Sequence, residues 1–135
     1  MADSRKIYLT DKDLNRLQEL VAHFYRNPDI EALEDELSRA IVVPQELIPP
    51  DVVTMNSTVR FQDMATGKEM EVTLVYPNKA NADMGRISVM APVGVALLGL
   101  SVGQTIEWPL PSGRIKRLKI LFIVYQPEAS GDWDL

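Results

Sequence analysis

The spacing of hydrophobic residues near the start of the chain predicts an amphipathic helix over residues 11–26. Four apolar residues recur there at intervals of three or four: Leu14, Leu17, Val21 and Phe24. Thr10 directly precedes this stretch, and its side-chain oxygen is a typical acceptor for the free backbone amides of a first helical turn. We therefore expect the helix to begin after Thr10.

A second helix is predicted after the break at Asn27-Pro28, where a proline is tolerated at the first helical position. Its apolar residues again fall on one face: Ile30, Leu33, Leu37 and Ile41. The link between the two helices is short, so they should fold back on each other as an antiparallel hairpin. We expect this hairpin, a short coiled coil, to occupy residues 1–43.

Beyond residue 43 the pattern changes from helix to strand. Pro44, Pro49 and Pro50 predict a semi-rigid connector over residues 44–51. Residues 52–135 then form a second domain with one short helix at residues 92–98, ended by Gly99 in a left-handed conformation. Short alternating or β-branched runs predict its strands: 52–55, 58–62, 69–76, 86–89, 104–108 and 115–125.

The fold class expected from these patterns is α+β. An N-terminal helical hairpin should precede a mostly antiparallel sheet that wraps around one short helix. Residues 120–124 are apolar at every position, which predicts a strand segment buried on both faces.

Composition narrows the classes of function. The 135-residue chain has no cysteine, which excludes disulfides, thiolate metal ligands and a cysteine nucleophile. Its formal net charge of −5 disfavours binding to nucleic acid through phosphate contacts, so no direct sequence-specific nucleic-acid binding is expected. No window is apolar enough to span a membrane, and the first residues do not form a signal peptide, so a cytoplasmic protein is expected.

No catalytic motif is evident. His23 is the only histidine, and three serines lack a recognisable base: Ser57, Ser88 and Ser101. A glycine-rich phosphate loop is also lacking. A basic group near residues 114–119 is typical of a solvated strand face: Arg114, Lys116, Arg117 and Lys119. We expect no enzymatic activity, no cofactor, no metal site and no small-molecule substrate.

Several blocks, in order, carry a resemblance to a known family: residues 51–59, 74–77, 88–94, 96–99 and 125–129. Together they resemble the regulator of nucleoside diphosphate kinase group of the GreA/GreB transcription elongation factor family. Cleavage factors of that family carry Ser-Pro and Gly-Asp where this sequence has Ala91-Pro92 and Gly103-Gln104. These departures favour the regulator group over the cleavage factors.

The resemblance implies an FKBP-like C-terminal domain, an N-terminal coiled coil, and binding to bacterial RNA polymerase at the rim of its secondary channel. The family loop that touches the rim matches Met90, Ala91 and Pro92. In cleavage factors, acidic residues at the coiled-coil tip help to hold a metal in the polymerase active site. The corresponding tip residues here are Asp29 and Glu31.

Length argues against metal delivery by that tip. A helix of about 16 residues spans only about 24 Å, shorter than the coiled coils of cleavage factors. Acidic residues in a first turn are also favoured simply by the helix dipole. We therefore expect Asp29 and Glu31 to serve as helix-end charges or as contacts with the channel wall.

The favoured interpretation is a non-enzymatic regulator that occupies the secondary-channel entrance and competes with Gre-type factors. An active cleavage factor is the first alternative. The second is a prolyl isomerase, which needs an aromatic-lined pocket; the aromatic residues of the sheet domain are not clustered in sequence: Phe61, Tyr76, Trp108, Phe122 and Tyr125.

Overall fold

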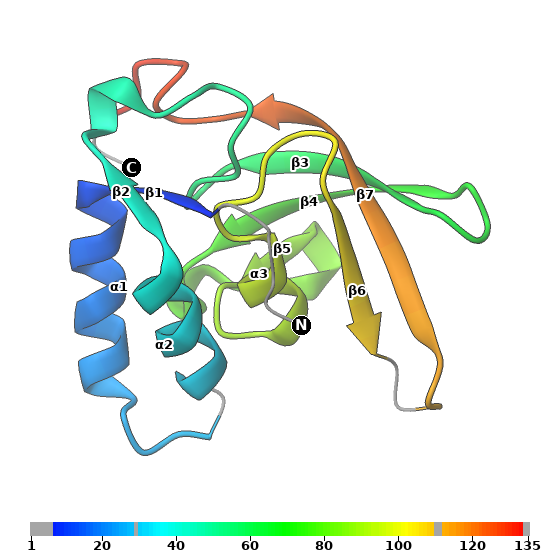
Figure 1. The fold of residues 1–135 in the computed structure, drawn as a ribbon, viewed down its shortest axis with the longest axis horizontal. Coiled ribbons are helices and arrows are strands. Elements are labelled where there is room, and N and C mark those ends of the chain that lie inside the picture. The colour runs from blue at the N-terminus through cyan, green and yellow to red at the C-terminus, as the bar shows by residue number, and fades with distance from the viewer. Residues whose placement is uncertain (1–6, 29, 110–111, 134–135) are drawn as a thin grey trace.

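Two short helices pack beside a curled five-stranded sheet in the computed structural model of the chain, which describes residues 7–28, 30–109 and 112–133 (Figure 1). Helix α1 covers Asp11–His23 and helix α2 covers Ile30–Arg39, and the two run antiparallel. Thr10 caps α1, because its Oγ1 accepts the backbone N–H of Asp13 at 3.0 Å. The predicted helical pair is confirmed, although α1 ends three residues early. Thirteen and ten residues are too few for the expected coiled coil, which needs three or more heptads.

A two-stranded parallel sheet joins the two ends of the helical pair. Strand β1 (Tyr8–Thr10) leads into α1, and strand β2 (Ile41–Val43) follows α2. Ile41 was expected on the apolar face of the second helix, and that prediction is wrong, because the helix ends at Arg39 and Ile41 pairs with Tyr8. Three consecutive β-branched residues after the helix favour extended backbone at this point.

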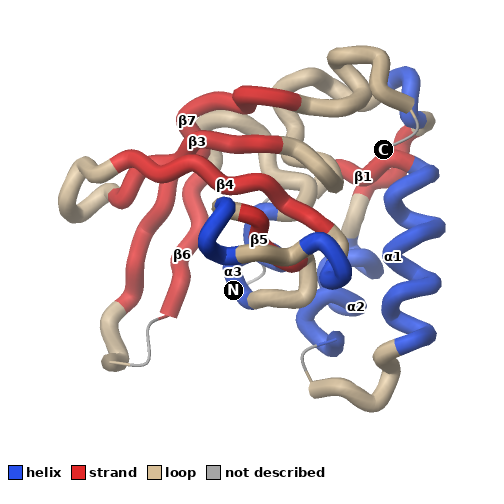
Figure 2. Tube along the Cα trace, turned by 180° about the vertical axis from the view of Figure 1, so that it is seen from behind, coloured by secondary structure: helices blue, strands red, loops and turns tan. Residues whose placement is uncertain are grey.

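The main sheet has the strand order β5-β4-β3-β7-β6, with β4 and β5 parallel and the other neighbours antiparallel. The strands of this sheet are β3 (Thr58–Asp63), β4 (Glu69–Val75), β5 (Arg86–Ser88), β6 (Thr105–Pro109) and β7 (Ile115–Tyr125). Helix α3 (Pro92–Leu97) follows β5, and single 3₁₀ turns cover Gln45–Leu47, Pro77–Lys79 and Ala82–Met84. The sheet curves around α3, with the helical pair to one side (Figure 2).

Three details of the predicted sheet domain are corrected. The sheet is mixed, because the loop after β4 returns β5 parallel to it. No strand forms at residues 52–55, where only Val52 makes an isolated bridge, to Ser101. Residues 120–124 are not buried on both faces: β7 lies inside the sheet, yet Phe122 and Val124 are 49% and 48% exposed on its outer face.

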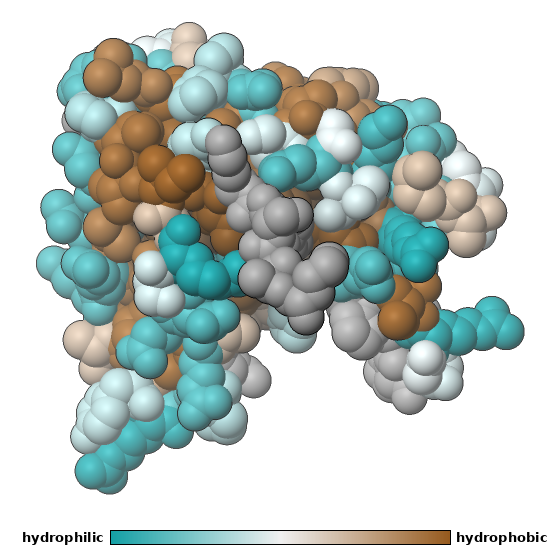
Figure 3. Space-filling model, in the orientation of Figure 1, coloured by the Kyte–Doolittle hydropathy of each residue, from teal (hydrophilic) through white to brown (hydrophobic). Residues whose placement is uncertain are grey.

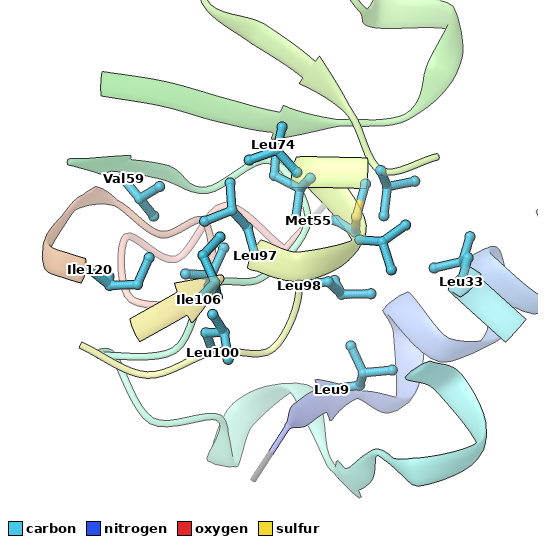
Figure 4. Close-up of a cluster of buried hydrophobic side chains, with 14 of the residues drawn as sticks. Leu9, Leu33, Met55, Val59, Leu74, Leu97, Leu98, Leu100, Ile106 and Ile120 are labelled. Atoms are coloured by element: carbon cyan, nitrogen blue, oxygen red, sulfur yellow. The ribbon is translucent and has the colours of Figure 1, made fainter. Parts of the chain in front are cut away.

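The helical pair and the sheet share one cluster of buried hydrophobic side chains. Leu9 of β1 and Leu33 of α2 point toward the side chains around α3, among them Leu98 (Figure 4). Leu17 of α1 and Ile30 of α2 belong to the same cluster. The helices are therefore held by hydrophobic burial against the body of the protein, not only by each other. A division into separate domains at residues 1–43, 44–51 and 52–135 stays a prediction.

A buried carboxyl group also joins α1 to the sheet region. Asp13 is 3% exposed, and its Oδ2 accepts the backbone N–H of Met55 at 3.1 Å. Nearby, the Thr54 hydroxyl donates to Glu128 Oε1 at 2.7 Å, which ties the C-terminal segment to the same place. Burial raises the pKa of Asp13 from 3.8 to about 6; the Met55 N–H opposes this rise, and the charge of Glu128 adds to it.

Gly99 lies two residues after α3 and packs against the start of β1, where a left-handed backbone and the lack of a side chain are both needed. Its φ of +77° is left-handed, as the sequence predicts, and a Cβ would lie 2.2 Å from Ile7 Cγ2. The N–H of Tyr8 donates to the Gly99 carbonyl at 3.1 Å, which fixes this close approach. Gly103 also has a left-handed φ, of +92°, but nothing lies within 4 Å of where its Cβ would be.

Gly99→Ala should therefore destabilise the protein more than Gly103→Ala. Each alanine bears the left-handed backbone cost of about 1–2 kcal/mol, and Gly99→Ala adds about 1–3 kcal/mol of overpacking against Ile7. Urea unfolding of both variants measures the difference. Equal losses of free energy would show that the contact with β1 does not constrain this position.

Asp13 should make stability depend on pH. The folded protein binds the Asp13 proton more tightly than the unfolded chain does, so the free energy of unfolding falls as pH rises from about 4 to about 6, by about 3 kcal/mol for this group, and is then constant. Asp13→Asn keeps an oxygen for the Met55 N–H but carries no charge. It should stabilise the protein by about 1–3 kcal/mol at pH 7.5 and change little at pH 4.

Urea unfolding at pH 4, 5, 6 and 7.5 tests this, with Asp51→Asn as the control at an exposed carboxylate. The control should leave the pH dependence unchanged. An Asp13→Asn variant that is destabilised at both ends of the pH range would contradict the interpretation.

Candidate functional site

The turn between β5 and α3 is built by local hydrogen bonds. Ser88 Oγ accepts the backbone N–H of Met90 at 3.1 Å, and the Ser88 carbonyl accepts the N–H of Ala91 at 3.0 Å. Ala91 is extended, with φ −71° and ψ 149°, and Pro92 occupies the first turn of α3, where it has no N–H to satisfy. The turn thus places Met90, Ala91 and Pro92 in one defined conformation.

Gly94 allows α3 to pack closely against this turn. A Cβ at Gly94 would lie 2.0 Å from the Ser88 carbonyl oxygen, so only glycine permits the approach. The neighbouring side chains Val93 and Val95 are buried. Pro92 is exposed, whereas Met90 and Ala91 are half-buried, so the turn offers a rigid and mostly apolar edge to solvent.

A groove of about 310 Å³ lies between α2 and this edge. Its lining comes from the approach to α2, from α2 itself and from the start of α3: Pro28, Ala32, Glu36, Met90, Pro92, Val95 and Ala96. Pro28 stands at the tip of the helical pair, so the tip and the Met90–Pro92 turn lie at the same groove. Of the residues that the sequence nominated, Met90 and Pro92 line this groove, whereas Glu31 is not part of its lining.

The helical pair is a short arm, although the turn that joins α1 to α2 projects past α3 (Figures 1 and 2). Helix α1, at 1.5 Å per residue, is about 20 Å long, and α2 lies between it and α3 (Figure 1). Glu31 is exposed in the first turn of α2, where its charge favours the helix end. Asp29 lies outside the described residues.

A second, larger cavity of about 700 Å³ lies on the other side of α1. Its lining residues come from α1, from Asn56 and from the 3₁₀ turn after β4: Arg16, Glu19, Leu20, His23, Phe24, Asn56, Tyr76, Pro77, Asn78 and Lys79. Burial raises the pKa of the Tyr76 phenol well above its usual range. The residues mix both charges with apolar surface, and no serine, threonine or cysteine is among the described lining residues beside His23.

The remaining sequence candidates do not assemble into a catalytic site. The His23 ring makes an edge contact with Phe24, at 4.7 Å between ring centres. Ser57 is buried, and its Oγ accepts the N–H of Thr54. Lys116 lies 3.7 Å from Asp63 Oδ2 on the sheet, and Arg114 and Arg117 are exposed.

The described aromatic side chains of the sheet domain do not line one pocket. Phe61 points into the core and Phe122 points outward from the neighbouring strand, whereas Tyr76 lines the larger cavity together with Phe24 of the helical pair. Within the described ranges, no three histidine, aspartate or glutamate side chains gather as a metal site. No helix in the described part is long and apolar enough to cross a bilayer.

Sequence reasoning missed the groove between α2 and α3. Pro28, Ala32 and Glu36 are spaced by four residues and so share one side of the helical segment, which the sequence could show. It could not show that this side faces the start of α3, because that depends on how buried Ile30 and Leu33 seat α2 against the core. The groove is a product of tertiary packing.

Two protein families match this chain, each over a different part of it. Residues 5–43 match the family described as "Rnk N-terminus", and residues 48–125 match "Transcription elongation factor, GreA/GreB, C-term". The chain is 45% identical over 129 residues to the "Regulator of nucleoside diphosphate kinase" of Escherichia coli K12, covering 94% of this chain and 95% of that protein. It is 39% identical to transcription elongation factor GreA of Chloroherpeton thalassium, covering 70% of this chain but only 59% of that longer protein.

Solved structures agree with the sequence comparison. The structure described as a prokaryotic transcription elongation factor GreA/GreB from Nitrosomonas europaea has a TM-score of 0.77 and 47% sequence identity, covering 89% of this chain and all of that chain. The Gfh1 protein of Thermus aquaticus is more distant, with a TM-score of 0.51 and 28% identity. The chain belongs to the GreA/GreB family and is a homologue of its regulators of nucleoside diphosphate kinase.

Proposed function

We propose that the chain is a non-enzymatic transcription regulator that binds RNA polymerase at the entrance of the secondary channel and competes there with Gre-type factors. Membership of the GreA/GreB family supports polymerase as the partner. The likeness to regulators of nucleoside diphosphate kinase, over nearly the whole chain, supports a regulatory role. Any effect on nucleoside diphosphate kinase would then follow from altered transcription.

The observation that carries the proposal is the position of the helical tip. A factor that delivers a metal ligand deep into a channel needs an arm that projects well beyond the domain docked at the rim. Here Pro28 at the tip lines the same groove as Pro92 of the docking turn. The tip therefore stays close to the rim, and Asp29 and Glu31 would meet the channel wall and not the active site.

The chemistry of the site supports the same interpretation. Delivery of a divalent cation by protein requires oxygen ligands held together, commonly one or two carboxylates. Glu31 is the acidic residue of the first turn of α2, and no three histidine, aspartate or glutamate side chains gather as a metal site in the described part of the chain. The described part of the tip offers a charged surface for contact without a formed ligand set.

We expect the docking surface to include Met90, Ala91 and Pro92, which lie on a turn that is rigid before binding. Ser88 and Gly94 fix the conformation of that turn, so docking would cost little ordering of the backbone. An exposed proline ring beside half-buried apolar side chains is a suitable centre for a small protein interface.

Binding to core RNA polymerase should be displaced by excess GreA. Pull-down of polymerase with the immobilised protein, repeated with increasing GreA, measures both binding and competition. Complete displacement at saturating GreA is expected, because one entrance cannot hold two factors. Retention of polymerase at every GreA concentration would place the binding elsewhere.

Pro92→Ala should weaken polymerase binding by about tenfold, which corresponds to about 1.4 kcal/mol. Alanine suits the first helical turn, so the fold should be kept while the exposed ring is lost. Pro50→Ala, at an exposed proline of the connector, is the matched control and should bind as the wild type does. Equal affinity of the two variants would remove the turn from the docking surface.

A further inference from the structure

The groove between α2 and α3 is open because small side chains line it. Ala32 of α2 and Ala96 of α3 both contribute to its lining. The adjacent side of α2 carries Ile30 and Leu33, which are buried in the shared core and hold the helix in place. The α2 side of the groove is thus held in place by the packing of Ile30 and Leu33 beneath it.

The size of the groove suits side chains more than a metabolite. Its volume of about 310 Å³ lies at the lower end of the range of about 300–1,000 Å³ found for small-molecule pockets. Apart from Glu36, its lining is apolar. Glu36 is itself buried and contacts Arg39, so the carboxylate at the groove is already partnered.

The charge around the groove is acidic. Helix α2 reads IEALEDELSR and carries four acidic residues, Glu31, Glu34, Asp35 and Glu36, against the single cation Arg39. Arg39 reaches both Asp35 and Glu36, and Glu31 and Glu34 are also exposed acidic residues of α2; Glu31 is the one that precedes the groove-lining Ala32. The charge complement of this surface is a lysine or arginine on the partner.

We propose that the α2–α3 groove receives an apolar side chain from a basic segment of RNA polymerase, so that the helical pair is part of the docking platform. This inference rests on the proposed function, because it extends the Met90–Pro92 contact across the groove. The partner segment would carry one aliphatic side chain for the groove and a cation next to it for Glu31. The helical pair would then contribute to recognition of the polymerase and would not enter the polymerase active site.

Continuity of surface is the main argument for this occupant. Met90 and Pro92 line the groove and also belong to the proposed docking turn. A partner that covers the turn therefore also covers the mouth of the groove. A partner that left the groove empty would bury a hollow without filling it and lose van der Waals contact on both sides.

Ala32→Arg tests the proposal by blocking the groove, and Ala22→Arg is the matched control. Ala22 is an exposed alanine of α1, so the two substitutions have the same chemistry and the same small helix-propensity cost. Binding to core RNA polymerase is measured for both by fluorescence anisotropy of labelled protein. We expect Ala32→Arg to weaken binding at least tenfold and Ala22→Arg to change it less than twofold.

A second variant tests the charge without filling the groove. Glu31→Gln should weaken binding about three- to fivefold at low salt, and the difference from the wild type should shrink at 0.5 M salt. Glu46→Gln, at an exposed acidic residue of the connector, should bind as the wild type does at both salt concentrations. An unchanged affinity for Glu31→Gln at low salt overturns the cationic part of the proposal.

The outcomes separate this proposal from the function it rests on. If the wild type binds polymerase and Pro92→Ala weakens binding, but Ala32→Arg behaves as Ala22→Arg does, the groove is not part of the interface and only this inference fails. If the wild type does not bind polymerase at all, both the proposed function and the inference are overturned. Weaker binding of Pro92→Ala, Ala32→Arg and, at low salt, Glu31→Gln, with the control variants unchanged, supports both.

Discussion

Burial of the inner sides of both helices in the core of the sheet is the constraint from which the rest of the structure follows. Leu17, Ile30 and Leu33 are buried with Leu98 and the strands, and Asp13 holds the N–H of Met55 beneath them. A helical pair used as a free arm would leave those side chains in water. Because each is worth about 1.5–3 kcal/mol when fully buried, the pair stays against the body of the protein.

Because of this placement, α2 forms one side of a groove and the helical pair is not a free arm. The placement brings Pro28 and Ala32 next to Met90 and Pro92, and so creates the α2–α3 groove. It also puts Glu36 of α2 in the same groove as Met90 and Pro92. Figure 3 shows apolar and polar surface alternating over one face of the molecule.

Local signals in the sequence were enough to predict most of the helices and strands. Thr10 capped the first helix as expected, the left-handed Gly99 ended the short helix, and alternation located β3 and β4. Those local signals could not predict which segments pair when they lie far apart in the sequence. Ile41 continued the helical spacing numerically, but it pairs with Tyr8, more than thirty residues earlier. The groove is likewise formed by two elements that are far apart in sequence. The sequence predicted the Met90–Pro92 turn on one side of the groove, but it could not predict that α2 forms the other side.

Transcript cleavage on a backtracked RNA polymerase complex tests the central claim most directly. The protein alone should leave the transcript length unchanged, and in excess over GreA it should slow the cleavage that GreA stimulates. Shortened transcripts produced by the protein alone would contradict the account, because they would require the helical tip to reach the active site.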